Sequence, residues 1–547
     1  MTDAASEARS TIGRASAMLA SGTLVSRVLG FISALVLART IGIVGAGADT
    51  FTLANQLPNN IYAIIAGGLL SAVLVPQIVR AGLHGDGGER FINRLVTLGI
   101  VVFLVVAALA TVGAPFLVNL YAQSGTHGFS SDELALATAF AYWCLPQVLF
   151  YALYSLVGEV LNARGVFGPF TWAPAINNVI AIGGLIGFTL LYGSHVAEQP
   201  ALAWTPSMIA LLGGSATLGI AAQAFVLFLF WRKAGLSYRP EFQWRGVGLG
   251  GAGRAAAWTF GMILVTQLAG IVQTNVSTLA SGEASVAVLR NAWLIFMLPH
   301  SIVTVSIGTA YFTRISGHAR DGDLDSLRSD VASSLRSILL VMVFAAVGLM
   351  VVAFPFSALF ASSYPQVQGL AGVLLAFLPG LVPFSILFVL QRVFYALEDT
   401  RTPFFIQIVQ ASVFVAGCLI VAVFPTATIA IGLAVSLTIA GTIQTIVAGL
   451  ALHRRIGEVG MRPVLRQSGW FALAAVPAAA AGILILLAIG GFGAGAFPVS
   501  SFLGGGVSVA VAGIGMLLVY VAVLALARNA ELLALAGPLL RRMRARS

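Results

Sequence analysis

The chain has 547 residues, of which 59% are hydrophobic and only 9% are charged, and its mean hydropathy is +0.97. Soluble globular proteins carry about 25% charged residues, so this composition excludes that class and predicts a polytopic membrane protein. The formal net charge of +10 comes from basic residues spread over short loops. It lacks the basic stripe with interleaved aromatic residues that a nucleic-acid-binding surface needs, so no nucleic-acid partner is predicted.

The polar residues 1–15 precede an apolar run that has no A-x-A cleavage pattern. They are therefore expected to form an N-terminal cytoplasmic tail before a first helix that is retained. Both cysteines, Cys144 and Cys418, lie in apolar stretches, which favours neither a disulfide framework nor a thiolate metal site.

Runs of apolar residues long enough to cross a bilayer recur along the whole chain. A crossing helix needs about 20 predominantly apolar residues. This criterion predicts an all-α fold with fourteen transmembrane helices. The spans are expected at residues 16–38, 50–79, 95–119, 134–161, 170–192, 205–231, 255–280, 287–312, 332–354, 369–391, 403–424, 427–451, 468–490 and 502–527.

Basic residues gather in alternate loops, as expected when the cytoplasmic loops retain arginine and lysine. These residues are Arg80, Arg90, Arg94, Arg164, Arg232, Lys233, Arg239, Arg245, Arg254, Arg314, Arg320, Arg328, Arg336, Arg392, Arg401, Arg454, Arg455, Arg462 and Arg466. The alternation predicts that both termini are cytoplasmic. Three basic residues do not follow it, namely Arg27, Arg39 and Arg290.

The sequence also contains an internal repeat. GTLVSRVLG at 22–30 resembles GMILVTQLAG at 261–270, LPN at 57–59 resembles LPH at 298–300, and VLNARGVFGPF at 160–170 resembles VFYALEDTRTPF at 393–404. Helices 1–6 and 7–12 are therefore predicted to be two lobes, inserted the same way up around a central cavity, with two further helices. The predicted divisions are the tail 1–15, the N-lobe 16–231, a cytoplasmic inter-lobe loop 232–254, the C-lobe 255–451, helices 13 and 14 at 468–527, and a basic cytoplasmic tail 528–547.

Arg27 lies near the middle of the first span, where a charge is costly unless it faces a polar cavity or an anionic partner. A guanidinium binds phosphate through a planar fork of donors, so Arg27 is a candidate for contact with an anionic headgroup. The alternative is an arginine that pairs with Asp49 or with backbone carbonyls and locks helices together.

Four other charged residues are candidate site residues, each with a plainer alternative. Arg39 is either a cavity cation or a residue that snorkels to the membrane surface. Asp49 serves in gating or ion coupling, or simply caps its helix. Arg290 lines the cleft or lies on the outer surface, and Glu159 takes part in coupling or pairs locally with a neighbouring arginine.

Pro58 and Pro299 lie inside predicted spans, where proline kinks a helix. Such kinks suit helices that bend during transport, and they also occur as static packing features. No phosphate-binding loop, nucleophile elbow, zinc-binding HExxH or Cys/His cluster is present. The sequence therefore favours a transporter over an enzyme, with no cofactor and no metal.

Several short motifs occur in a fixed order within the fourteen-helix pattern: SRVLGF at 26–31, ADTF at 48–51, LPN at 57–59, TWAPAINN at 171–178, MLP at 297–299 and FYALEDTRTPF at 394–404. In these motifs the chain resembles the MurJ/MviN lipid II flippases of the multidrug/oligosaccharidyl-lipid/polysaccharide exporter superfamily, in particular the actinobacterial branch. The resemblance spans residues 16–527.

The resemblance implies a flippase that moves lipid II, the undecaprenyl-diphosphate-linked disaccharide pentapeptide, from the inner to the outer leaflet of the bacterial plasma membrane by alternating access. It implies that Arg27 meets the diphosphate and that helices 13 and 14 form a groove for the lipid tail. Membrane lipids and cell-wall synthesis proteins are the other expected partners. The alternatives are an exporter of another lipid-linked glycan or of drugs, and a non-transporting scaffold of the cell-wall synthesis complex.

Some positions depart from the pattern of the Gram-negative members. Ser33, Tyr62 and Leu294 stand where those members have arginines, and Gly67 replaces a glutamate. Arg290 lies one turn before Leu294 on the same helix face and is a candidate to replace the missing charge. The sequence does not decide which residues bind the diphosphate together with Arg27. It also does not decide what energy source drives transport.

Overall fold

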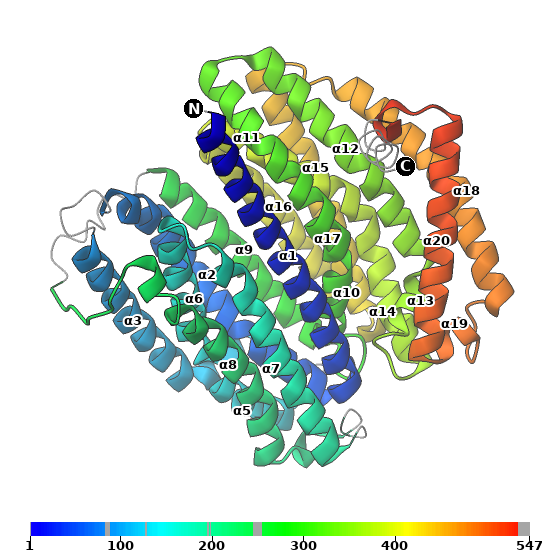
Figure 1. The fold of residues 1–547 in the computed structure, drawn as a ribbon. Coiled ribbons are helices and arrows are strands. Elements are labelled where there is room, and N and C mark those ends of the chain that lie inside the picture. Colours follow the sequence, from blue (N-terminus) through cyan, green and yellow to red (C-terminus); the bar gives the residue numbers. More distant parts are fainter. Residues whose placement is uncertain are drawn as a thin grey trace. The chain divides into compact units, whose positions relative to one another are not determined.

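The computed structural model describes residues 2–81, 88–125, 128–193, 196, 199–243 and 254–533, with the backbone alone described for 2–20, 66–81 and 254–256. Regular structure in this part of the chain is helical, without a β-strand. The chain forms two compact units, Met1–Gly282 and Glu283–Ser547. Figure 1 shows the helices of each unit in sequence colours.

The first unit is built mainly from long helices. Its helices are α1 (Thr2–Ile41), α2 (Ala46–Ala81), α3 (Glu89–Val112), α4 (Ala114–Tyr121), α5 (Ser131–Cys144), α6 (Gln147–Ala163), α7 (Gly168–Tyr192), α8 (Pro206–Phe228) and α9 (Arg254–Thr278).

The second unit repeats this design and extends it with a further pair of long helices. Its helices are α10 (Val286–Pro299), α11 (Val305–Asp321), α12 (Leu324–Val351), α13 (Ala353–Ser357), α14 (Tyr364–Phe377), α15 (Leu381–Ala396), α16 (Arg401–Val421), α17 (Thr426–Ile456), α18 (Met461–Ile489), α19 (Phe497–Ser500) and α20 (Phe502–Leu526). The extra pair, α18 and α20, packs together, and α18 also lies against α12 (Figure 1).

Among the described residues, 13 helical segments are long and apolar enough to cross a membrane. The predicted all-α membrane fold is therefore confirmed, whereas the count of fourteen stays a prediction. The helix α2 is not one of the 13, and its second half is described by backbone alone. Residues 244–253 of the predicted inter-lobe loop and residues 534–547 of the predicted tail lie outside the described residues.

Five of the predicted spans are interrupted, one of them near its end at Val352, between α12 and α13. Gly113 separates α3 from α4, and Pro146 separates α5 from α6. In the second unit Pro299 ends α10 before a π-helical turn, and Pro379 lies in the short 3-10 turn between α14 and α15. Proline has no N–H for the helix ladder, and its ring crowds the preceding turn, so three of the interruptions fall where prolines occur.

The repeat is visible in the helix boundaries. The helices α5 and α14 begin 233 residues apart and end 233 residues apart, and the starts of α7 and α16 differ by the same number. The Leu-Pro pair that interrupts the first unit at Leu145–Pro146 recurs at Leu378–Pro379. Corresponding helices of the two copies therefore match residue by residue over this stretch.

The first compact unit includes α9, which the sequence repeat assigns to the predicted C-lobe, 255–451. Two hydrogen bonds attach the end of α9 to the last turn of α4 and to the connection after it. The Asn275 amide donates to the Leu120 carbonyl, and the Gln123 backbone N–H donates to the Thr278 hydroxyl, both at 2.9 Å. The compact units thus divide after α9, and the lobe boundaries taken from the repeat stay a prediction.

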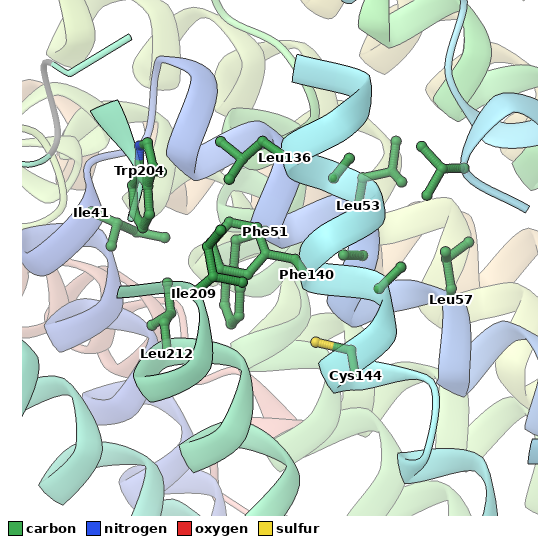
Figure 2. Close-up of a cluster of buried hydrophobic side chains, with 14 of the residues drawn as sticks. Ile41, Phe51, Leu53, Leu57, Leu136, Phe140, Cys144, Trp204, Ile209 and Leu212 are labelled. Atoms are coloured by element: carbon green, nitrogen blue, oxygen red, sulfur yellow. The ribbon is translucent and has the colours of Figure 1, made fainter. Parts of the chain in front are cut away.

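A cluster of buried aromatic and aliphatic side chains holds α2, α5 and α8 together in the first unit (Figure 2). The ring of Phe140 lies edge-on to Phe51 at 5.3 Å and to Trp204 at 5.5 Å between centroids. Trp204 also lies directly over Gly47, where an added Cβ would come within 2.1 Å of the indole. This close packing fixes the first turns of α2, which carry Asp49.

Candidate functional site

The rotation of α1 is set by small residues that contact α7. Gly22, Ser26 and Gly30 are spaced four apart and therefore lie on one face. The amide of Asn178 donates to the Ser26 carbonyl at 3.0 Å. Arg27 follows Ser26 by one residue, so its side chain points about 100° away from this contact face.

Arg27 lies at the edge of the contact between α1 and α7. It is partly buried, whereas Leu24 and Val28, which lie on the side of α1 opposite the Gly22–Ser26–Gly30 face, are exposed to 52% and 50%. A guanidinium at this depth needs a polar environment, because a charge facing hydrocarbon is costly. The structure thus places the predicted cation within the apolar part of α1, between a packed face and an exposed apolar face.

Arg39 and Asp49 lie on either side of the turn between α1 and α2. Arg39 is in the last turn of α1, and Asp49 is in the first turn of α2. The Asp49 side chain is completely buried, and its backbone N–H donates to the Gly45 carbonyl at 3.1 Å. The positive end of a helix dipole favours a carboxylate at this position.

The three predicted arginines do not come from one place in the fold. Arg27 and Arg39 are separated by twelve residues of α1, which corresponds to about 18 Å along the helix. Arg290 belongs to the second unit, where it is exposed on α10 after the buried residues 286–289. The combination of these residues into one diphosphate site stays a prediction.

The helix α6 has one stripe that its neighbours leave open. Between residues 151 and 160 only Tyr151, Tyr154, Ser155 and Glu159 are not buried. Three of them, Tyr151, Ser155 and Glu159, are spaced four apart and share a face. The pairing of Glu159 with the neighbouring Arg164, considered from the sequence, stays a prediction.

Polar residues of α2 face this stripe. Asn55, Asn59 and Tyr62 share a face of α2, and the Tyr62 ring stacks on Tyr151 with 5.9 Å between centroids. The Tyr62 side chain also lies close to Ser155 and Glu159. The two helices therefore meet along a polar seam, which we define as Asn59, Tyr62, Tyr151, Ser155 and Glu159.

A buried amide closes one end of the polar seam. Gln147, at the start of α6, is only 1% exposed, and its Nε2 donates to Asn55 Oδ1 at 3.1 Å and to Thr217 Oγ1 at 3.0 Å. A buried polar group without such bonds would destabilise the fold. Gln147 thus ties α6 to α2 and α8 and orients the seam.

The two predicted hinge prolines have different surroundings. Pro58 is buried inside the continuous helix α2, whereas Pro299 is followed by the π turn His300–Thr304. At this turn the buried ring of His300 contacts the hydroxyl of Ser385 at 3.2 Å. π turns often mark functional positions in helices. Only Pro299 therefore coincides with a local change of helix type.

Sequence reasoning missed Gln147, Tyr151 and Ser155, and it did not connect Tyr62 with Glu159. The available signal was a polar residue at every fourth position of α6, from Gln147 to Glu159. Hydropathy averaged over a span conceals this spacing, because four polar residues change the mean only slightly. No group of three or more potential metal ligands occurs among the described residues.

The fold is that of a multi-helix membrane transporter. A solved structure titled "Inward-facing conformation of a multidrug resistance MATE family transporter of the MOP superfamily" matches 80% of this chain and 96% of that one, with a TM-score of 0.62 and 16% identity. A structure titled "Lipid II flippase MurJ, inward closed conformation" matches 93% of this chain and 98% of that one, with a TM-score of 0.71 and 19% identity. At these identities the likeness concerns the fold alone.

The family follows from the sequence match. The model of the family "Lipid II flippase MurJ" matches residues 37–505, so the chain belongs to this family of multi-pass membrane transporters. The probable lipid II flippase MurJ of Haemophilus influenzae is 28% identical over 419 residues, covering 71% of this chain and 76% of that protein. The corresponding Vibrio cholerae protein is 26% identical over 465 residues, covering 82% of this chain and 83% of that protein.

Proposed function

We propose that this protein is a flippase that moves lipid II from the inner to the outer leaflet of the bacterial plasma membrane by alternating access. The observation that carries the proposal is the family match over residues 37–505, which includes most of both units. The expected orientation has both termini in the cytoplasm, because the arginine-rich loops alternate with loops that are nearly free of basic residues.

Arg27 has the central role in this proposal. A diphosphate that crosses the apolar part of the membrane must exchange its hydration for fixed donors, and a guanidinium supplies them in a planar fork. Arg27 is partly buried within α1 and adjoins the small-residue contact with α7. These surroundings support a cation that meets the diphosphate inside the membrane.

Arg39 and Arg290 are proposed to contact the same diphosphate at other stages of transport. Arg39 lies about 18 Å from Arg27 along α1, too far for both to hold one diphosphate in the same position. Two cations at different depths of one helix suit a headgroup that moves along it. Asp49, buried beside the turn after Arg39, and Glu159 are the proposed gating or coupling carboxylates.

Substitution of Arg27 tests the function and the role together. In cells depleted of the native protein, the fraction of lipid II reachable by an impermeant reagent from outside should fall and should be restored by the wild-type chain. We expect Arg27→Ala to fail to restore it and Arg27→Lys to restore it in part, since lysine keeps the charge but loses the fork.

The matched control is Arg320→Ala, which removes an arginine whose side chain is 81% exposed in the second unit. It should restore accessibility as the wild type does. Undiminished accessibility after depletion, in cells without a second flippase, would refute the function. Full restoration by both Arg27 variants would refute the role of Arg27 and leave the function standing.

A further inference from the structure

The polar seam between α2 and α6 lies on helices that are predominantly apolar, and it extends to Glu159 near the end of α6. Its five residues are partly or fully exposed, whereas the other residues of α6 between 151 and 160, except Tyr154, are buried. Amide, hydroxyl and carboxylate groups that faced hydrocarbon would lose their hydrogen bonds with water. The open side of the seam must therefore face a polar space or a polar ligand.

The polar character of the seam is not required for helix packing. The second unit carries the same helices 233 residues later, and there Tyr151 and Ser155 are replaced by Phe384 and Phe388. Both phenylalanines pack on the ring of His300, at 4.5 and 5.4 Å. Since one copy of the bundle is built with aromatic residues at these positions, the polar residues of the other copy need a different reason.

The chemistry of the seam indicates the kind of ligand. Tyr62 and Tyr151 supply aromatic surface and hydroxyl groups, Asn59 supplies an amide, and Glu159 supplies a carboxylate that accepts hydrogen bonds. The seam contains no cationic side chain, so it does not suit a diphosphate. Aromatic rings combined with amide, hydroxyl and carboxylate groups suit a ligand rich in hydroxyl groups.

We propose that the polar seam binds the glycan part of the lipid-linked substrate, while Arg27 meets the diphosphate. The proposal rests on the function given above. The length of the seam supports it, because Tyr151 and Glu159 are eight residues apart and span about 12 Å along α6. A surface of this length contacts more than one sugar ring. Tyr62 and Tyr151 are the specificity-determining pair, and Glu159 is a hydrogen-bond acceptor at the end of the seam.

Binding of two lipids by the purified full-length protein separates the glycan from the diphosphate. The first lipid is polyprenyl diphosphate carrying the disaccharide pentapeptide, and the second is the same polyprenyl diphosphate without it. Native mass spectrometry gives a Kd for each. We expect Tyr151→Leu to weaken binding of the first lipid about tenfold, the size of a lost aromatic contact. Binding of the second lipid should change by less than about twofold.

Two variants guard against a simple loss of structure. Tyr62→Phe and Ser155→Ala each remove one hydroxyl from the seam and keep the packing. Each should therefore weaken binding of the glycan-bearing lipid selectively, but by less than Tyr151→Leu does. Tyr142→Leu is the matched control, because Tyr142 is 47% exposed on α5 and is not part of the seam. It should leave both Kd values unchanged.

The outcomes separate this inference from the proposed function. A selective loss for the glycan-bearing lipid in the seam variants, with both Kd values unchanged in Tyr142→Leu, supports the seam. An equal loss for both lipids, or no loss in any seam variant, overturns it and leaves the function intact if the wild type prefers the glycan-bearing lipid. If the wild type shows no such preference, the proposed substrate fails, and the seam assignment fails with it.

Discussion

The seam between α2 and α6 in the first unit has a counterpart between the π turn and α15 in the second. At matching positions the first unit has Tyr151 and Ser155, and the second has Phe384 and Phe388. The helices α6 and α15 end 233 residues apart, so the backbone is shared over this stretch, whereas α2 continues through Pro58 and α10 ends at Pro299. The difference lies in the side chains of one open stripe.

The counterpart of Glu159 is also informative, because it is Arg392. Its guanidinium lies over the Phe388 ring, 4.3 Å from the centroid, and 5.3 Å from the centroid of Phe312. Aromatic faces stabilise a cation in such a position. The acidic end of the polar seam is thus replaced in the second unit by a cation held on aromatic rings.

After the duplication, α6 and α15 kept the same backbone, whereas the side chains on their exposed stripe became different. Apart from Gln147 and Ser385, the buried residues of α6 and α15 are apolar, because each helix must pack against its neighbours. The residues of the open stripe do not have to pack in this way, so we attribute their identities to function. We therefore expect substitutions among the packed aromatic residues of the second unit to affect stability, and those in the polar seam to affect binding.

The largest effect on stability is expected from Phe296→Ala in the second unit. Phe296 is 3% exposed, and its ring contacts Trp293 at 5.0 Å and Phe384 at 5.7 Å. Truncation of a buried phenylalanine leaves a cavity and costs about 3–5 kcal/mol. The thermal unfolding midpoint of the purified protein should fall markedly. Asn55→Ala, at the matching position of the first unit, should lower it much less, and equal losses would contradict the contrast.

A smaller effect is expected from Gln147→Leu in the first unit. It removes the two hydrogen bonds to Asn55 and Thr217 and should destabilise the protein by about 1–3 kcal/mol. The double variant Gln147→Leu with Asn55→Leu should lose less than the sum of the two single losses, since no half-paired amide remains. If the stability losses of the two single variants, measured by thermal unfolding, add up exactly in the double variant, the two amides act independently.

The smallest effect concerns pH and the loop between α15 and α16. Asp399 accepts hydrogen bonds from the Thr402 N–H at 2.9 Å and from its hydroxyl at 2.7 Å, and it pairs with Arg455. Burial opposes ionisation of this carboxyl, but the bonds from Thr402 and the charge of Arg455 outweigh it and hold the pKa below the ordinary value of 3.8. The matching loop of the first unit, 164–167, has no carboxylate.

A carboxyl with a lowered pKa in the folded state stabilises the fold above its ordinary pKa and loses this contribution as the pH falls through the lowered value. The wild type should therefore unfold at a higher temperature than Asp399→Asn at pH 7, and the difference should shrink below about pH 4. A difference that stays constant between pH 7 and pH 3 would exclude this role of the ionised Asp399.

Part of the fold could be predicted because helix formation in a membrane depends on local composition. The apolar runs predicted the helices, and the LPN and LPH motifs together with the other repeated motifs predicted the duplication. The break at Pro146 was missed, because a span average does not register one proline. Hydropathy likewise identified Arg27 as a charge within an apolar span, but it did not indicate in which direction the side chain points.

The candidate site was predictable only as single residues. Arg27, Asp49 and Glu159 stand out because a charge inside an apolar run is visible without a structure. Their neighbours are not visible in this way, since Tyr62 and Tyr151 are 89 residues apart and are ordinary aromatic residues in the sequence. The stack between them exists because α2 packs against α6.

The sequence by itself determined the membrane class, the helical frame, the duplication and the position of the intramembrane charges, because each depends on composition over a short stretch or on repeated motifs. Only the tertiary structure decided which face of each helix is buried, that α9 groups with the first compact unit, and that a polar seam joins α2 to α6. These features depend on contacts between residues far apart in the chain, and no local property of the sequence specifies them.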